Sequence, residues 1–307
     1  MLTKYHDTKI WALKYNNSDV SELKIDGSTL WKSPLEYTLL SNGTYSVKAR
    51  VATQHVVGDE NEYEDGSGMY YCQFIKPIDD TLVDPTSPSL SVNVIAGTNV
   101  TSIDSVAVLN GHIIVFAYVN RADTTSSIDL ELRDLPETLV IPSTFNGKAV
   151  TKIEEGGFKD CTKLKTLVIP DSVTTYGDTG KVFEGCSNLT SITLPLRDYK
   201  LHYLFGASSD SDAKDYVPKS LSEVILKGSS ISKAPMSGFS WRVNVYIASS
   251  VTTIVASAFS SVAEAYLYLY CEASSAQSGW DSKWNYSAAG RAHTTNYSVT
   301  PPTYVTG

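Results

Sequence analysis

The stretch KLKTLVIPDSVTTYGDTGKVFEGCSNL, residues 163–189, decides the fold of this protein. Leu167 and Ile169 alternate with residues that point the other way, which is the two-residue period of a β-strand. Pro170 removes a backbone donor and therefore ends the strand. Two aromatic residues further along are expected to fold back beneath this strand, namely Tyr176 and Phe183.

The pattern of this stretch occurs six times in the chain. Its short apolar strands are LVIP (139–142), LVIP (167–170), ITLP (192–195), VIL (224–226), VYI (245–247) and LYL (267–269). From one copy to the next, the third residue of the strand advances by 28, 25, 32, 21 and 22 residues. Periods of about 20–30 residues are typical of leucine-rich and related solenoids. Because one copy cannot bury its apolar face alone, we expect the copies to stack, with their strands in a parallel sheet.

Three longer phrases carry a family resemblance. They are IPSTFNGKAVTKIEEGGFKDCTKLKTLVIPDSV (141–173), LHYLFGASSDSDAKDYVPKSLSEVIL (201–226) and YCEASSAQSGWDSKWNY (270–286). With these phrases, residues 135–286 resemble the BspA-like leucine-rich repeat family of bacterial surface proteins. The copies that contain KAPMSGFSW and IVASAFSSVAEA lack the usual Cys-x-x-Leu. The resemblance implies an adhesin that binds host or neighbouring-cell molecules, with no shared catalytic site.

The front half of the chain reads as antiparallel β-structure. Two stretches are predicted strands, 69–76 and 90–95. Tight type I′ hairpin turns are predicted where Asn-Gly or Asp-Gly separates two apolar-alternating arms, since both central residues need positive φ. These pairs are Asp26-Gly27, Asn42-Gly43 and Asn110-Gly111. Together the strands predict a small sandwich.

Two further resemblances concern this front half. The phrase DVSELKIDGSTLWKSP (19–34) is similar to the start of many structural proteins from phages and prophages of gut bacteria. In the BspA-like family, a phrase like LEYTLLSNGTYSVKA (35–49) runs almost directly into the first repeat, whereas here a long segment intervenes. We interpret that segment as an inserted β subdomain, about 50–134. The predicted organisation is an antiparallel β anchoring domain (1–134), a leucine-rich repeat solenoid (135–286) and a C-terminal tail or cap (287–307).

Charge and motif content argue against several classes of function. The formal net charge is −8 and no basic run exists to neutralise phosphates, so we expect no nucleic-acid partner and no membrane insertion. The first residues lack the apolar segment of a secretory signal. No nucleophile-elbow, phosphate-loop or dinucleotide-binding pattern occurs, and the five histidines form no ligand pair. We therefore predict a protein that is not an enzyme, without cofactor or metal.

An acidic stretch and a pair of cysteines have simple structural interpretations. GDENEYEDGSG (58–68) lacks the spacing of a calcium-binding loop and is expected to be a solvated hairpin tip. Cys161 and Cys186 occupy equivalent places in successive repeats and are expected to be stacked, buried thiols. Trp280 and Trp284 are expected to cap the core, with a sugar-stacking platform as the alternative.

The outward strand residues are predicted to form the exposed face of the sheet. They are Thr166, Val168, Ser191, Thr193, Glu223, Ile225, Asn244, Tyr246, Tyr266, Tyr268 and Tyr270. This face begins small and polar and ends in tyrosines, which are favoured at binding surfaces because they offer flat apolar area with a polar tip. We predict a binding site at Tyr246, Tyr266, Tyr268 and Tyr270. The alternative is that the C-terminal tail or a cap covers them.

These features together predict a phage virion structural protein of the tail, fibre or head surface that displays a repeat module for adhesion. Its expected partners are other virion proteins, through the N-terminal domain, and a host surface protein or glycan, through the repeat face. The protein is therefore expected in the virion, and it could form a homo-oligomer. One alternative is a bacterial cell-surface BspA-like adhesin. A second is a polysaccharide-degrading virion enzyme, because such sites assemble across strands without a local motif.

Overall fold

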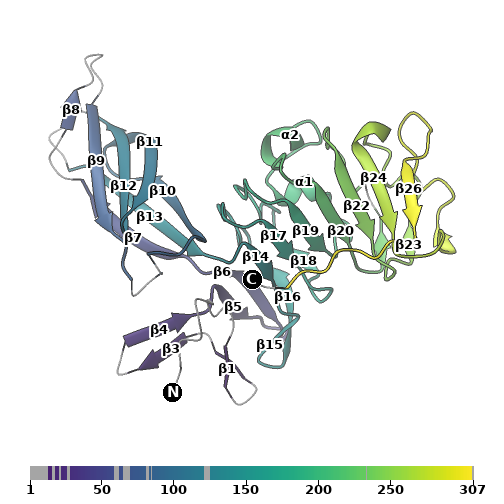
Figure 1. Ribbon diagram of the computed structural model, residues 1–307, viewed down its shortest axis with the longest axis horizontal. Helices are drawn as coiled ribbons and strands as arrows, with labels where there is room; N and C mark the ends of the chain where they lie inside the picture. The colour runs from purple at the N-terminus through teal and green to yellow at the C-terminus, as the bar shows by residue number, and fades with distance from the viewer. Residues whose placement is uncertain are drawn as a thin grey trace. The chain divides into compact units, whose positions relative to one another are not determined.

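A computed structural model describes the chain from residue 13 to residue 305 with short gaps (Figure 1). The described ranges are 13–15, 18–20, 22–25, 28–58, 62–64, 70–80, 83, 85–120, 125–232 and 234–305. The chain forms two compact units, and both units are mainly β. The first comprises Met1–Ser21, Leu35–Ala49 and Pro136–Gly307, and the second comprises Glu22–Pro34 and Arg50–Leu135.

A seven-stranded parallel sheet organises the first unit. Its strands, in spatial order, are β14 (Thr138–Val140), β17 (Thr166–Val168), β19 (Ser191–Leu194), β20 (Glu223–Leu226), β22 (Val243–Ile247), β24 (Leu267–Cys271) and β26 (Thr294–Tyr297). Each strand pairs in parallel with the next. The six predicted strands are therefore confirmed, in the predicted order. Strand β26 was not predicted, because its sequence TTNY has no apolar alternation.

The strand register aligns one continuous row of inward side chains. This row consists of Leu139, Leu167, Ile192, Val224, Val245 and Leu269. All six are buried, none more than 2% exposed. Full burial of one such side chain contributes about 1.5–3 kcal/mol, so the row is a large stabilising term shared by neighbouring copies.

A second set of short strands forms the opposite edge of the stack, in two separate groups. The first group pairs in parallel and aligns Val47, Ile153 and Tyr176; its strands are β6 (Tyr45–Ala49), β16 (Lys148–Ile153) and β18 (Thr175–Tyr176). The second group aligns Ile231, Ile254 and Trp280; its strands are β21 (Ser230–Ile231), β23 (Thr253–Ile254) and β25 (Gly279–Trp280). Between β19 and β20 the chain instead forms α1 (Leu201–Leu204) and α2 (Ala213–Tyr216). These helices account for the longest step of the repeat, 32 residues.

The lead-in phrase 35–49 belongs to the repeat unit, not to the front half with which the sequence interpretation grouped it. Strand β5 (Leu35–Leu39) pairs antiparallel with β6, and β6 pairs in parallel with β16. The Ala49 amide donates to the Gly157 carbonyl at 2.7 Å. β6 therefore acts as an additional copy at the start of this edge.

The loop within this lead-in hairpin corrects a turn prediction. Residues 40–44 connect β5 to β6, and Gly43 has φ +80, whereas Asn42 does not lie in the left-handed region. The side chain of Asn42 instead accepts from the Thr44 amide at 3.0 Å. The two-residue type I′ turn predicted at Asn42-Gly43 is therefore wrong. A further short strand, β15 (Thr144–Phe145), pairs with β16 and brings Phe145 onto Tyr37, with ring centroids 3.9 Å apart.

The second unit contains two antiparallel sheets that share one core. The three-stranded sheet is ordered β10 (Leu90–Ala96), β13 (Ser127–Asp134), β7 (Ala52–Val57). The four-stranded sheet is ordered β11 (Val100–Leu109), β12 (His112–Val119), β9 (Tyr70–Pro77), β8 (Glu62–Glu64). Residues of both sheets form one buried cluster that includes Phe74, Val115 and Leu130. The predicted sandwich packing of two sheets is thus present, and β9 and β10 match the predicted strands.

Only one of the two turns predicted in the second unit lies within the described residues. Asn110 and Gly111 have φ values of 49 and 73 and join β11 to β12, so the type I′ turn is confirmed there. β3 (Glu22–Ile25) pairs antiparallel with β4 (Ser28–Lys32), whereas the turn residues Asp26 and Gly27 lie outside the described residues.

In the first unit, β1 (Leu13–Tyr15) pairs with β2 (Ser18–Val20). None of the helices in the described ranges is long and apolar enough to cross a bilayer.

Candidate functional site

The outward face of the seven-stranded sheet carries two rows of aligned side chains. We use "outward face" for these rows only. The first row is Thr166, Ser191, Glu223, Asn244 and Tyr268, and the second is Val168, Thr193, Ile225, Tyr246 and Tyr270. The rows arise because alternate residues of a strand point to opposite sides, and because the parallel register places equivalent residues side by side.

Three of the four predicted binding tyrosines meet at one end of the outward face. The rings of Tyr246 and Tyr270 are stacked, with centroids 4.9 Å apart and an interplanar angle of 20°. The Arg242 guanidinium lies over the Tyr268 ring at 4.2 Å, a favourable cation–π contact. All three tyrosines are partly exposed. We call Tyr246, Tyr268, Tyr270 and Arg242 the tyrosine cluster.

The fourth predicted tyrosine lies just outside the paired strands. Tyr266 ends the 3-10 helix η1 (Glu264–Tyr266), just before β24, and is 39% exposed. It was placed on the outward face by extending the strand alternation by one residue pair. The chain is already helical at that point, so the alternation does not hold.

The centre of the outward face is covered, in contrast to the prediction of an exposed face. Ser191, Thr193 and Ile225 are only 4%, 6% and 2% exposed. The C-terminal segment runs back from β26 toward β14 (yellow in Figure 1), and the Tyr304 hydroxyl donates to the Glu223 carboxylate. The same carboxylate oxygen accepts from the Ser191 hydroxyl at 2.7 Å. The tail therefore contacts the outward face beside the tyrosine cluster. The alternative left open by the sequence was that the tail covers the tyrosines themselves, and these remain partly exposed.

Burial and the Glu223 carboxylate raise the pKa of two tyrosines near this contact. Burial raises the pKa of Tyr304, and its hydrogen bond to Glu223 raises it further. Burial likewise raises the pKa of Tyr246, together with the charge of Glu223 and the neighbouring Tyr270. Both hydroxyls therefore remain protonated donors at neutral pH. The Tyr304 hydroxyl donates to Glu223, whereas the Tyr246 hydroxyl suits a ligand that offers carbonyl, carboxylate or hydroxyl oxygens.

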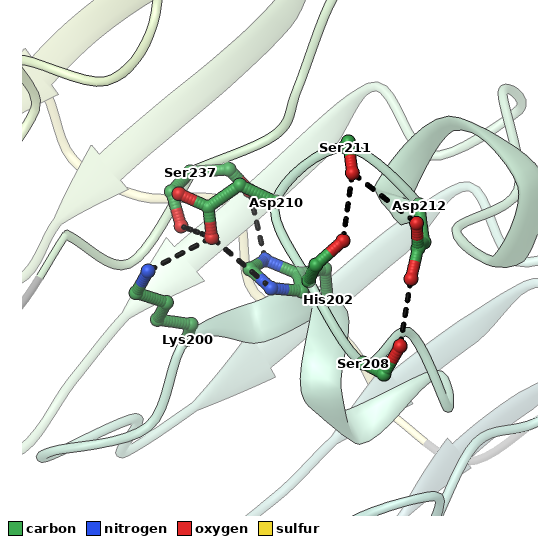
Figure 2. Close-up of polar contacts among 8 residues, drawn as sticks. Lys200, His202, Ser208, Asp210, Ser211, Asp212 and Ser237 are labelled. Atoms are coloured by element: carbon green, nitrogen blue, oxygen red, sulfur yellow. Dashed lines mark hydrogen bonds and ion pairs between the residues drawn. The ribbon is translucent and has the colours of Figure 1, made fainter.

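A polar network in the copy that contains α1 and α2 was not predicted (Figure 2). His202 is fully buried, and its Nδ1 lies 2.8 Å from the Ser237 carbonyl oxygen, to which it donates. Its Nε2 lies 3.4 Å from Asp210 Oδ1. That oxygen accepts from Lys200 Nζ at 2.8 Å and from Ser237 Oγ at 3.1 Å.

This network holds loops together and is not arranged as a nucleophilic triad. The Ser237 hydroxyl donates to the carboxylate, so the imidazole does not activate it. Burial opposes ionisation of Asp210, but the hydrogen bonds from Lys200 and Ser237 outweigh it and lower the pKa of that carboxyl. The neutral imidazole ties α1 to the 236–238 turn. No sequence motif signals this arrangement, because its members come together only through the stacking of two copies.

Acidification is expected to destabilise the protein through its buried histidines. Burial lowers the pKa of His202, and likewise that of His293, below the ordinary value near 6.5. The unfolded chain therefore binds more protons between the folded pKa and about 6.5, so stability is complete above that value and is lost as pH falls. At pH 5.5 the loss is at most about 1.4 kcal/mol per histidine.

Urea unfolding at pH 7.5 and 5.5 measures this effect. His202→Gln is expected to lower stability at pH 7.5 and to reduce the difference between the two pH values. An unchanged pH difference in this variant would contradict the assignment of the effect to His202.

A hollow beside α2 offers a second surface. Its volume is about 450 Å³, and its lining residues are Gly185, Cys186, Ser187, Phe205, Lys214, Asp215, Tyr216, Val217, Pro218 and Lys219. Tyr216 is 48% exposed, and Lys214 Nζ lies 3.9 Å from an Asp215 carboxylate oxygen. Tyr216 is exposed and lies away from the outward face, so it serves below as the matched control tyrosine.

The remaining predicted residues are placed as follows. Trp280 and Trp284 are 7% and 3% exposed, and Trp280 Nε1 donates to the Val251 carbonyl at 2.9 Å, so both are core residues. Cys161 and Cys186 are both buried, as predicted. The acidic stretch lies largely outside the described residues. Among the described side chains, no group of three or more His, Cys, Asp or Glu is arranged to hold a metal ion.

Comparison with known proteins identifies the repeats. Residues 137–209 match the family model described as a BspA type leucine rich repeat region (6 copies). The match spans β14 to the loop before α2 and confirms the predicted resemblance for that part of the chain. No curated protein and no solved structure matches the chain. The similarity of residues 19–34 to phage structural proteins stays a prediction.

Proposed function

We propose that this protein is a non-enzymatic adhesion module, in which the stacked repeats form a solenoid that presents a binding surface. The observation that carries the proposal is the tyrosine cluster at the end of the outward face. Its three tyrosines lie on the neighbouring strands β22 and β24 and are partly exposed, and the Tyr268 ring packs against the Arg242 guanidinium. The match to a BspA-type repeat region supports the same conclusion.

The chemistry of the tyrosine cluster suits a host surface protein or a glycan. Tyr246 and Tyr270 form a flat stacked pair that offers apolar area at low entropic cost. Arg242 is exposed and adds a fixed positive charge with several donors. Binding through few, pre-positioned side chains needs little reorganisation, which favours affinity.

Loss of the tyrosine cluster is expected to abolish adhesion without unfolding the protein. Replacing Tyr268 and Tyr270 together by alanine removes one partner of each ring contact, and we expect at least a tenfold loss of binding, about 1.4 kcal/mol or more. Attachment of labelled protein to candidate host cells, together with a glycan array, measures it. Tyr216→Ala is the matched control and should bind like the unmodified protein. Unchanged attachment in the double variant would end this proposal.

The biological setting that we propose is a virion surface, with the second unit as the anchor; a bacterial cell surface is the alternative. The similarity of residues 19–34 to phage structural proteins supports the first setting. Mass spectrometry of purified virions tests it, and virions that lack the protein would exclude it. Incubation with host capsular glycans tests the non-enzymatic part of the proposal, since release of shorter oligosaccharides would contradict it.

A further inference from the structure

The C-terminal tail indicates which class of ligand fits the outward face. Ser298 has φ +60 and turns the chain after β26, and the amides of Ser298 and Val299 donate to the carbonyls of Ala273 and Cys271, each at 3.0 Å. Pro301 and Pro302 follow; they have fixed φ and no amide donor, so they favour an extended chain. The tail is thereby redirected across the strands and does not pair with them.

The reach of the tail agrees with the contact that it makes. Tyr304, which is bonded to β20, lies five positions after Val299, which is bonded to β24. An extended chain of five residues spans about 17 Å, and the two strand spacings from β24 to β20 are about 10 Å. Tyr304 therefore reaches Glu223 without distortion of the sheet, and the tail passes the position of Tyr246 on the way.

The outward face supplies a set of polar partners for such a segment. One oxygen of the Glu223 carboxylate accepts hydrogen bonds from Ser191 and from Tyr304 while the tail is bound. Asn244 lies beside Glu223 in the same row, and its Oδ1 is buried with no hydrogen-bond partner among the described residues. Apolar contact area comes from Ile225, which is 2% exposed although it points outward.

From this arrangement we propose that the outward face between β19 and β22 is a binding groove for an extended polypeptide that carries a tyrosine, and that the chain's own segment Pro301–Val305 occupies it. For an external partner the inference rests on the proposed adhesive function. A partner polypeptide must then displace the tail, in competition with a tethered ligand at an effective concentration of about 1 mM or more. The tail thus sets a threshold for adhesion.

A synthetic peptide of residues 298–307, labelled with a fluorophore, tests the groove. Protein truncated after Thr300 is expected to bind the peptide with a Kd on the order of 0.1 mM, and the full chain about tenfold more weakly. Tyr304→Phe in the peptide, or Glu223→Gln in the truncated protein, should each weaken binding roughly fivefold or more. Circular dichroism checks that the truncated protein is folded. If it is not, full-length Tyr304→Ala replaces it, because it keeps the chain intact but frees the groove.

Several outcomes would overturn the proposal. A folded truncated protein that does not bind the peptide at millimolar concentration excludes the groove, as does a full chain that binds as well as the truncated one. Cell attachment of the same proteins separates this inference from the adhesive function. Truncation should raise attachment severalfold and free peptide should reverse the gain. If neither truncation nor free peptide changes attachment, the proposed competition by the tail is wrong, but the adhesive function is not contradicted. If none of the variants attaches to cells, the adhesive function is wrong, but the result of the peptide-binding experiment still holds.

Discussion

Replacing Phe183 by alanine is expected to destabilise the protein by about 3–5 kcal/mol, the usual cost of removing a buried aromatic ring and leaving a cavity. Phe183 is fully buried and lies between Phe158 and Phe205, with ring centroids at 6.3 and 5.6 Å. These three rings come from successive copies of the repeat. Removing the Phe183 ring therefore weakens two interfaces between copies, because each copy depends on its neighbours for burial.

Equilibrium urea unfolding followed by circular dichroism measures this change. The matched control is Tyr216→Ala, an exposed aromatic residue in the same part of the chain, which should change stability by no more than about 0.5 kcal/mol. A Phe183→Ala variant that is as stable as this control would show that the ring ladder does not hold the copies together.

The second large effect is expected from two deletions that differ in one hairpin. Removing residues 50–135 and joining Ala49 to Pro136 by a flexible linker of about ten Gly and Ser residues should leave the repeat unit folded, because the second unit has its own core. Removing residues 35–135 should cost about 3–6 kcal/mol more, because it also takes away the buried side chains of Leu35 and Val47.

Thermal unfolding of the two deletion proteins, each compared with the full chain, separates these cases. We expect one cooperative transition near that of the repeat unit for the first deletion, and a clearly lower transition for the second. If both deletions unfold the repeats equally, residues 50–135 are not an insertion in an otherwise complete repeat unit, and that interpretation fails. If neither deletion has an effect, the hairpin of β5 and β6 does not stabilise the first copy.

The strands of the repeats could be predicted because their signal is local. Each copy carries an alternating apolar strand such as Leu167 and Ile169 followed by a turn, and this is enough to fix both the strand and its inward side. The same holds for the hairpin at Asn110-Gly111, whose residue types match the positive φ that the turn needs. Strand β26 was missed since its inward residue is Thr295, which has no apolar signal.

The candidate site could be predicted only in part. The alternation along β22 and β24 places Tyr246, Tyr268 and Tyr270 on one face, and their stacking follows from the register. Tyr266 is not part of the strand pairing, because a 3-10 helix precedes β24, so its place in the site stays a prediction. The His202 network was missed because Lys200, Asp210 and Ser237 are separated in sequence and meet only when copies stack.

By itself, the sequence determined the mainly β class, the parallel order of six strands and the side of each strand that faces the core, because these depend on periodicities of two residues and of one repeat. Only the tertiary structure decided which outward positions are exposed. Ser191, Thr193 and Ile225 have the pattern of surface residues, yet they are buried near a tail that begins roughly 70 to 110 residues later in the chain. Burial by a distant segment depends on where the chain turns and how far it reaches, and neither leaves a local pattern in the strands that it covers.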